Sequence, residues 1–164
     1  MGSGRSGLYS GTHGSNEAVA ELLYALGEDV IIRIMPNGDR NIDFNQLPGS
    51  KGYQVAHRLS DRQMEFLTNE YGVEFAQVYQ QGPGKNGGGG KYFIYSGSVN
   101  SVFVPINKDT MLINHTHPGG TAWPSKEDMK LMALSAQLGS PQRTSSIIPA
   151  GKKAIYFTSK GKKR

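Results

Sequence analysis

Residues 111–128 constrain the fold more than any other part of this chain, because they place several polar side chains directly after a short apolar run. Residues 111–113 predict the end of a buried strand, and residues 118–124, which begin and end with proline and contain two glycines, predict an irregular loop. Ser125 predicts the N-cap of a helix that runs to about residue 138. The sequence therefore predicts a strand, a loop and a helix in succession.

Three side chains in this strand, loop and helix are potential metal ligands. His115 and His117 are separated by one residue, so at the end of an extended strand they point to the same side. Asp128 follows Ser125 by three positions, which places both residues on one face of the first helical turn. Two neutral imidazoles and one carboxylate, with a fourth position left to water, suit a catalytic zinc ion better than a structural one. The stretch thus predicts Zn²⁺ bound by His115, His117 and Asp128.

A carboxylate also stands out on the strand predicted at residues 73–80. Both faces of this strand are largely apolar, which predicts a central strand in a sheet that is covered on both sides. Glu74 shares a face with Ala76 and Val78. It either reaches solvent at the end of the strand or lies in a cleft with a partner that offsets its desolvation.

The order His-x-His-Pro, six residues and Ser-x-x-Asp, with a glutamate well upstream, resembles the signature of the JAB/JAMM (MPN-domain) metalloprotease family. The resemblance covers about residues 60–160. It implies an α/β (α+β) fold with a mixed central β-sheet flanked by helices, and a metal site where a strand ends and a helix begins. Such a fold agrees with the order of predicted elements along the chain.

The resemblance also implies roles for two residues that are not metal ligands. Glu74 would be the general base that takes a proton from zinc-bound water, and Ser125 would donate a hydrogen bond to the oxyanion. Glu65 and Glu70, predicted on the preceding helix, are the alternatives for the base. Ser125 is equally well explained as an N-cap alone.

The family cleaves peptide or isopeptide bonds, often to ubiquitin or a ubiquitin-like tail, so the resemblance implies a protein substrate. Gly119, Gly120 and Trp123 lie in the loop between the ligands and are candidates for the substrate groove, although Trp123 could instead pack against the sheet. A non-catalytic MPN-like binding module would be expected to lack ligands, and none is missing here. A metal-dependent nuclease is the other alternative, although its helix would need a second His or Asn.

The segment at residues 7–14, followed by a compact domain and a basic end, resembles the C-terminal toxin cassette of bacterial polymorphic (Rhs-type) proteins, several of which carry JAB-like domains. This resemblance implies a translocated effector that acts in the cytoplasm of a target cell and is made with an immunity protein. A cytoplasmic peptidase is the competing context.

Composition limits the remaining possibilities. A chain of 164 residues with 37% hydrophobic residues suits one soluble domain, and no apolar run approaches the roughly 18 residues of a membrane span. The absence of cysteine excludes disulfides, thiolate ligands and the zinc nucleobase deaminases. The net charge of +5 owes much to residues 160–164, which predicts a solvated tail and argues against a nucleic-acid partner.

The predicted organisation has four parts: a flexible N-terminal segment, partly a cloning remnant, at residues 1–15; a helix and hairpin extension at residues 16–58; the metalloprotease domain at residues 59–160; and a basic tail at residues 161–164. Ser60 and Gln63 predict a capping box for a helix that ends at Gly72. Other elements are predicted as follows: a helix at residues 16–26, strands at residues 30–35, 40–44, 91–95, 98–106, 145–149 and 153–158, and a flexible connection at residues 82–90.

Overall fold

A computed structural model of the chain describes residues 32–34, 40–42 and 47–163. Strands β2 (Ile32–Ile34) and β3 (Arg40–Ile42) pair in antiparallel fashion, which confirms the predicted pairing with shorter strands. The flexible segment predicted at residues 1–15 and the helix predicted at residues 16–26 lie outside the described residues. Within the described part of the chain, no helix is long and apolar enough to cross a membrane.

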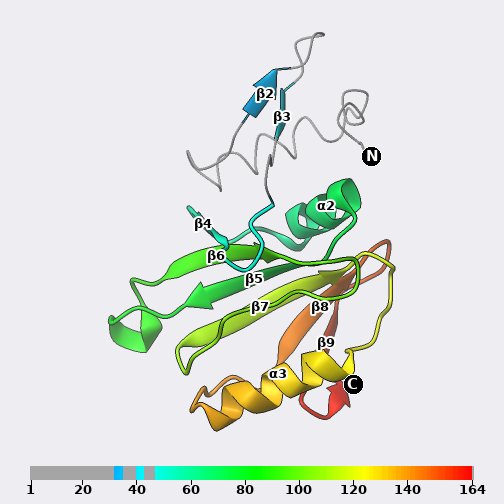
Figure 1. Cartoon of the computed structure of the whole chain (residues 1–164). Coiled ribbons are helices and arrows are strands. Elements are labelled where there is room, and N and C mark those ends of the chain that lie inside the picture. Colours follow the sequence, from blue (N-terminus) through cyan, green and yellow to red (C-terminus); the bar gives the residue numbers. More distant parts are fainter. Residues whose placement is uncertain (1–31, 35–39, 43–46, 164) are drawn as a thin grey trace.

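The main domain is built on a seven-stranded open sheet with the strand order β10-β9-β8-β7-β5-β6-β4 (Figure 1). Its strands are β4 (Tyr53–Val55), β5 (Phe75–Gln80), β6 (Lys91–Ser96), β7 (Thr110–His117), β8 (Ser145–Pro149), β9 (Ile155–Thr158) and β10 (Gly161–Lys162). The pair β7 and β8 is parallel and the other neighbouring pairs are antiparallel, so the sheet is mixed. With two helices packed against it, this sheet confirms the predicted α+β class.

Helix α2 (Asp61–Tyr71) covers one face of the sheet (Figure 1). It begins at the predicted capping box, where the Ser60 hydroxyl accepts a hydrogen bond from the Gln63 backbone N–H and the Gln63 side chain accepts one from the Ser60 N–H. Gly72 ends the helix in the left-handed conformation, with φ of 69°. The core on this side consists of Val55, Leu59, Met64, Leu67, Phe75, Ile94 and Ile148.

Helix α3 (Lys126–Gln137) lies across the opposite face of the sheet, with Ser125 as its N-cap as predicted (Figure 1). Its buried Met132 packs into a second apolar core. That core also contains Ala76, Val78, Tyr95, Val104, Leu112, Ile147 and Phe157. The sheet is therefore covered on both faces, which explains why its central strands carry apolar residues on both sides.

Strand β5 is central, as predicted, because it pairs with both β6 and β7. Phe75 belongs to the core under α2, whereas Ala76 and Val78 belong to the core under α3. The strand begins at Phe75 rather than at residue 73, so Glu74 lies immediately before it. Glu74 therefore lies where the chain enters the central strand β5, at the end of that strand.

Strand β7 carries an irregularity that the sequence pattern does not reveal. Val78 pairs with Leu112, but Gln77 pairs with Asn114, so Ile113 is an extra residue opposite β5. Such a bulge interrupts the strict alternation of side chains. As a result Leu112 and His115 both lie on the α3 side, where Leu112 joins the core and the His115 ring contacts Phe157.

The strand predicted at residues 98–106 is wrong, because these residues pair with no strand of the described chain. Their alternation is real, since Val102, Val104 and Ile106 pack toward the core under α3 while Phe103 is 68% exposed. The neighbouring strands β6 and β7 already have partners on both sides. The segment therefore lies on the face of the sheet and not within it.

Two other segments, the glycine-rich connection and the basic end of the chain, form more regular structure than the sequence suggests. The glycine-rich connection between β5 and β6 contains a 3₁₀ turn, Lys85–Gly87, and the Tyr79 hydroxyl donates a hydrogen bond to the Gly87 carbonyl. At the basic end, where a tail is predicted, β10 pairs with β9, while the side chain of Lys162 remains exposed. Both segments are thus held by the main domain.

Buried Gln77 makes a prediction about stability. Its side chain accepts a hydrogen bond from the Leu59 N–H at 2.7 Å and donates one to the Leu59 carbonyl at 3.1 Å. Gln77→Leu would leave both backbone groups of Leu59 without a partner, which costs about 1 to 3 kcal/mol. We expect urea denaturation to show that loss, while the exposed control Gln54→Leu changes stability by less than about 0.5 kcal/mol. Equal losses in the two variants would contradict this role.

Candidate metal centre

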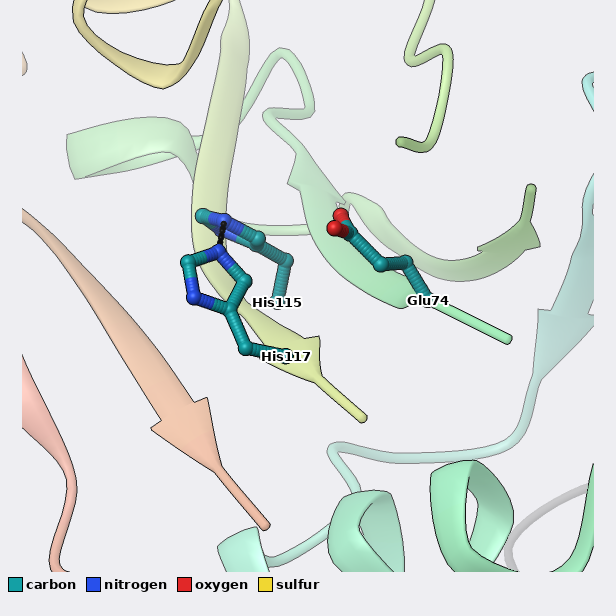
Figure 2. Close-up of side chains that lie close together, drawn as sticks. All are labelled: Glu74, His115 and His117. Atoms are coloured by element: carbon teal, nitrogen blue, oxygen red, sulfur yellow. Dashed lines mark hydrogen bonds between the residues drawn. The ribbon is translucent and has the colours of Figure 1, made fainter. Parts of the chain in front are cut away.

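Four polar side chains converge where β7 ends and α3 begins. His115 and His117 come from the last residues of β7, Asp128 from the first turn of α3, and Glu74 from the residue before β5. Figure 2 shows the Glu74 carboxylate and both imidazole rings on the same side of the sheet. The sequence prediction that these residues lie near one another is therefore supported by their placement.

The ligand atoms of the three residues predicted from the sequence lie close to one another, at distances near those around a tetrahedral metal ion. The Nε2 atoms of His115 and His117 lie 3.2 Å apart. The His115 Nε2 atom is 3.1 Å from Oδ1 of Asp128, and the His117 Nε2 atom is 3.4 Å from Oδ2. Metal–ligand distances of about 2.0 to 2.2 Å place two tetrahedral ligands about 3.3 to 3.6 Å apart. The two Nε2 atoms and one Asp128 oxygen could therefore occupy three corners around one zinc ion after small side-chain shifts.

Glu74 supplies a second carboxylate to the same cluster. The residue is 6% exposed, and one ligand atom from each of Glu74, His115 and His117 lies within 4.8 Å of the others. This buried Glu-His-His group could itself hold a metal ion. The geometry thus allows two ligand sets, which share the histidines and differ in whether Asp128 or Glu74 completes them.

The orientation of His117 is fixed by a backbone carbonyl. Its Nδ1 atom lies 2.7 Å from the Thr121 carbonyl oxygen, which can only accept a hydrogen bond. Nδ1 therefore carries a proton, and in the neutral ring Nε2 presents its lone pair to the cluster. Burial lowers the pKa of His117, but its hydrogen bonds to Asp128 and Thr121 and the charge of Glu74 outweigh burial and raise that pKa.

His115 is held mainly by packing. Its ring lies edge-on to the Phe157 ring, with centroids 5.8 Å apart, and the residue is 2% exposed. The Nδ1 atom is buried and has no hydrogen-bond partner among the described residues. Two imidazoles in one cluster are thus positioned by different means, one by a carbonyl and the other by an aromatic wall.

Asp128 and Ser125 form a reciprocal capping box at the start of α3. The Ser125 hydroxyl accepts a hydrogen bond from the Asp128 N–H at 3.0 Å, and the Ser125 N–H donates to Oδ2 of Asp128 at 2.8 Å. Burial raises the pKa of Asp128, but hydrogen bonds from His115 and His117 outweigh it and hold that pKa well below its usual range. The N-cap role predicted for Ser125 is confirmed, and the capping box also fixes the Asp128 carboxylate.

Glu74 has the protonation behaviour of a group that can exchange a proton near neutral pH. Burial raises its pKa from 4.5 to about 7; the charge of His117 lowers it and the charge of Asp128 raises it. The alternative glutamates are on α2. Of these, Glu65 accepts a hydrogen bond from the Gly151 N–H at 2.7 Å. The positions of the three glutamates favour Glu74 as the residue that acts with the histidines.

A groove of about 720 Å³ adjoins the cluster. One wall is formed by residues 100–106 and the other by α3, and Glu74, Ser125 and Asp128 also line it. This groove was not expected from the sequence, because residues 98–106 were predicted to form a paired strand. The apolar residues of the segment that face the core alternate along it, but no local signal shows that the segment would lie beside α3.

The three residues predicted for a substrate groove do not line the groove beside α3. Trp123 is 61% exposed, and its only described ring contact is with the sheet's edge strand β10, where the Nζ atom of Lys162 lies 4.8 Å from the ring centroid. Neither Trp123 nor Gly119 nor Gly120 is among the residues that line the groove beside α3. These three residues belong to the loop that connects the histidines to Asp128.

Comparison with protein-family models, curated proteins and solved structures gives no match for this chain. The relation to the JAB/JAMM family therefore remains a prediction from the motif. The chemistry of the buried cluster is the observation from which a function can be inferred.

The raised pKa of Glu74 predicts how stability depends on pH in metal-free protein. Between pH 4.5 and about 7 the folded state retains a proton that the unfolded state has lost, so stability falls as pH rises through this range. Glu74→Gln removes this ionisation. In the presence of a chelator, its melting temperature relative to the unchanged protein should therefore increase from pH 4.5 to pH 8.

The control for this measurement is Glu127→Gln, which removes an exposed carboxylate from the same region. Its difference from the unchanged protein should not show this rise between pH 4.5 and pH 8, because the variant removes an exposed carboxylate and no buried one. A Glu74→Gln difference that is equally flat would show that burial does not perturb this carboxyl.

Proposed function

We propose that this protein is a zinc-dependent hydrolase that cleaves peptide or isopeptide bonds, as a JAMM-type metalloprotease does. The observation that carries the proposal is the spacing of 3.1 to 3.4 Å between ligand atoms of His115, His117 and Asp128, with buried Glu74 beside the histidines. Two imidazoles and one carboxylate leave a coordination position open, as catalytic zinc sites do. Glu74 is then free to act as a base.

Bound Zn²⁺ would polarise the attacked carbonyl and lower the pKa of a coordinated water toward about 7. Glu74 would accept a proton from the attacking water and pass it to the leaving amine, which suits a carboxyl whose pKa is raised to about 7. Ser125 would donate its hydroxyl hydrogen to the oxyanion, because its oxygen already accepts from Asp128 and its hydrogen has no acceptor among the described residues.

The groove beside α3 supports an extended polypeptide as substrate. Val102, Val104, Leu131 and Leu134 give it apolar walls, and its other lining residues include Glu74 and Asp128. From Ser125 to Leu134 the helix rises about 13 Å, the length of about four extended residues. A ubiquitin-like tail is one such substrate. The translocated-toxin context and an immunity partner are proposals that rest on the N-terminal resemblance alone.

The two possible ligand sets make opposite predictions for two variants. We expect the purified protein to bind about one zinc ion per chain, and the double variant His115→Ala, His117→Ala to bind none. If Asp128 is the third ligand, Asp128→Asn should lose most of the zinc while Glu74→Gln keeps it and loses 10² to 10⁴ in hydrolysis rate. Elemental analysis measures zinc, and cleavage is assayed on isopeptide-linked ubiquitin dimers and on an unfolded protein.

The outcomes separate the alternatives. If Glu74→Gln lost zinc and Asp128→Asn kept it, Glu74 would be the third ligand in place of Asp128. Zinc that remains in the double histidine variant would contradict the centre altogether. Zinc bound in the expected way without cleavage of any protein substrate would contradict the hydrolase and leave a metal-binding module.

Ser125 has two roles whose loss should be separable. Loss of a cap costs about 0.5 to 2 kcal/mol of stability, whereas loss of an oxyanion hydrogen bond costs 10² to 10³ in kcat. Ser60 caps α2 in the same reciprocal way and is not in the cluster, so Ser60→Ala is the matched control. We expect similar falls in melting temperature for both alanine variants, and a large fall in kcat for Ser125→Ala only. Equal kcat values per folded molecule would reduce Ser125 to a cap.

A further inference from the structure

The turn that follows β8 makes several contacts around His117. This turn, residues 149–152, is closed by a hydrogen bond from the Lys152 N–H to the Pro149 carbonyl, and Gly151 has a positive φ of 76°. His117 is the register partner of Pro149 in the parallel pair of β7 and β8. The turn therefore lies beside His117, the last candidate ligand on β7, although it follows His117 by some thirty residues in the sequence.

Two contacts from this turn reach the chain at His117 and just beyond it. The Ala150 N–H donates a hydrogen bond to the His117 carbonyl at 3.0 Å, and the Lys152 ammonium donates one to the Gly120 carbonyl at 2.7 Å. The Gly120 N–H in turn donates to the His117 carbonyl at 2.9 Å, which closes a tight turn. Lys152 thus holds the residue next to Thr121, whose carbonyl oxygen fixes the His117 ring.

The space around Gly120 also leaves little room for a side chain. Its φ is 81°, a left-handed conformation that favours glycine, and a Cβ atom there would lie 3.2 Å from the Ala150 carbonyl oxygen. Gly119 is its neighbour, but a Cβ atom at Gly119 would have nothing within 4 Å. Only the second glycine of the pair is thus fitted to the turn after β8.

Helix α2 supports this turn from the other side. The Gly151 N–H donates to the carboxylate of Glu65 at 2.7 Å. A chain of contacts therefore runs from Glu65 to the turn, from Lys152 to Gly120, and from the adjacent Thr121 carbonyl to His117. Partners of this kind commonly orient ligating histidines, and their loss typically lowers metal affinity or activity by 10- to 100-fold.

We propose that Lys152 is a positioning residue for His117, which acts through the Gly120 and Thr121 backbone to hold the imidazole Nε2 toward the metal centre. This inference rests on the proposed zinc site. If Lys152 positions His117 in this way, its ammonium group favours metal binding despite its positive charge, because it holds the imidazole ring in place. If the ammonium group acted only through its charge, its removal would have the opposite effect, because less repulsion would allow tighter binding of Zn²⁺.

The sign of the change in zinc affinity therefore tests the proposal. Lys152→Met keeps much of the side-chain length and removes the hydrogen bond, and Lys153→Met makes the same charge change at an exposed neighbour. We expect chelator competition to give a zinc dissociation constant raised about 10-fold for Lys152→Met. Lys153→Met should bind unchanged or slightly tighter. Unchanged or tighter binding in Lys152→Met would overturn the proposal.

A glycine pair provides a second test that leaves every charge in place. Gly120→Ala should weaken zinc binding about as much as Lys152→Met, whereas Gly119→Ala should not. Melting temperatures of the metal-free variants identify any general loss of fold. Should Lys152→Met fail to fold, the glycine pair decides the question, and equal affinities for Gly119→Ala and Gly120→Ala would count against the proposal.

A readout on metal-free protein separates this proposal from the zinc hypothesis. At a pH where His117 is neutral, ¹⁵N NMR of the imidazole should show the proton on Nδ1 in the unchanged protein and in Lys153→Met, and a mixture of tautomers in Lys152→Met. If the unchanged protein binds no zinc, the proposed function fails, and the tautomer still shows whether Lys152 positions the ring. If zinc binds but neither affinity nor tautomer responds to Lys152→Met, only the positioning role fails.

Discussion

Burial of several ionisable side chains between the sheet and α3 is the constraint on which the rest of the structure depends. Each of these groups would be costly to bury alone, because a charge taken out of water must be paired or neutralised. The cluster meets this requirement in different ways. Asp128 stays ionised because it accepts hydrogen bonds from the histidines, which lower its pKa, whereas burial raises the pKa of Glu74 to about 7. Two carboxylates near the same imidazoles thus differ in the charge they carry at neutral pH.

This difference in charge gives the two carboxylates different chemistry. A carboxylate that stays ionised is suited to bind a cation, and one that gains and loses a proton near neutral pH is suited to acid–base catalysis. The assignment of Asp128 as ligand and Glu74 as base therefore agrees with their surroundings. The spacing of donor atoms alone permits the reverse assignment.

The sequence predicted those features that depend on local signals. The capping box at Ser60 and the N-cap at Ser125 are each specified by a few neighbouring residues, and the apolar residues on both faces of the strand predicted at residues 73–80 correctly indicated a strand covered on both faces. For the same reason, the strand, loop and helix around His117 are where they were predicted. The approach of Glu74 to the histidines was expected from the resemblance and not from any local pattern.

The remaining features depend on contacts between distant parts of the chain. The bulge at Ile113 is set by pairing with β5, and the segment at residues 98–106 failed to form a strand because both neighbouring strands were already paired. The Thr121 carbonyl and Lys152 were missed because nothing in their own sequence neighbourhood shows what they will contact. Periodicity reports which side of a segment is apolar, but not which element covers it.

The short connection between β7 and α3 has a consequence for how a metal ion would couple to folding. An ion bound by His117 and Asp128 would close the loop of residues 118–127, whereas an ion bound by Glu74 in place of Asp128 would close the roughly fourfold longer span between Glu74 and His115. Loop-closure entropy grows by about 0.6 kcal/mol for each doubling of length, so the two ligand sets differ by only about 1 kcal/mol in this contribution. In either case the two cores that hold the helices to the sheet consist of apolar side chains and include none of the candidate ligands. Metal exchange is then a local event at the end of one strand, and it leaves the architecture of the domain in place.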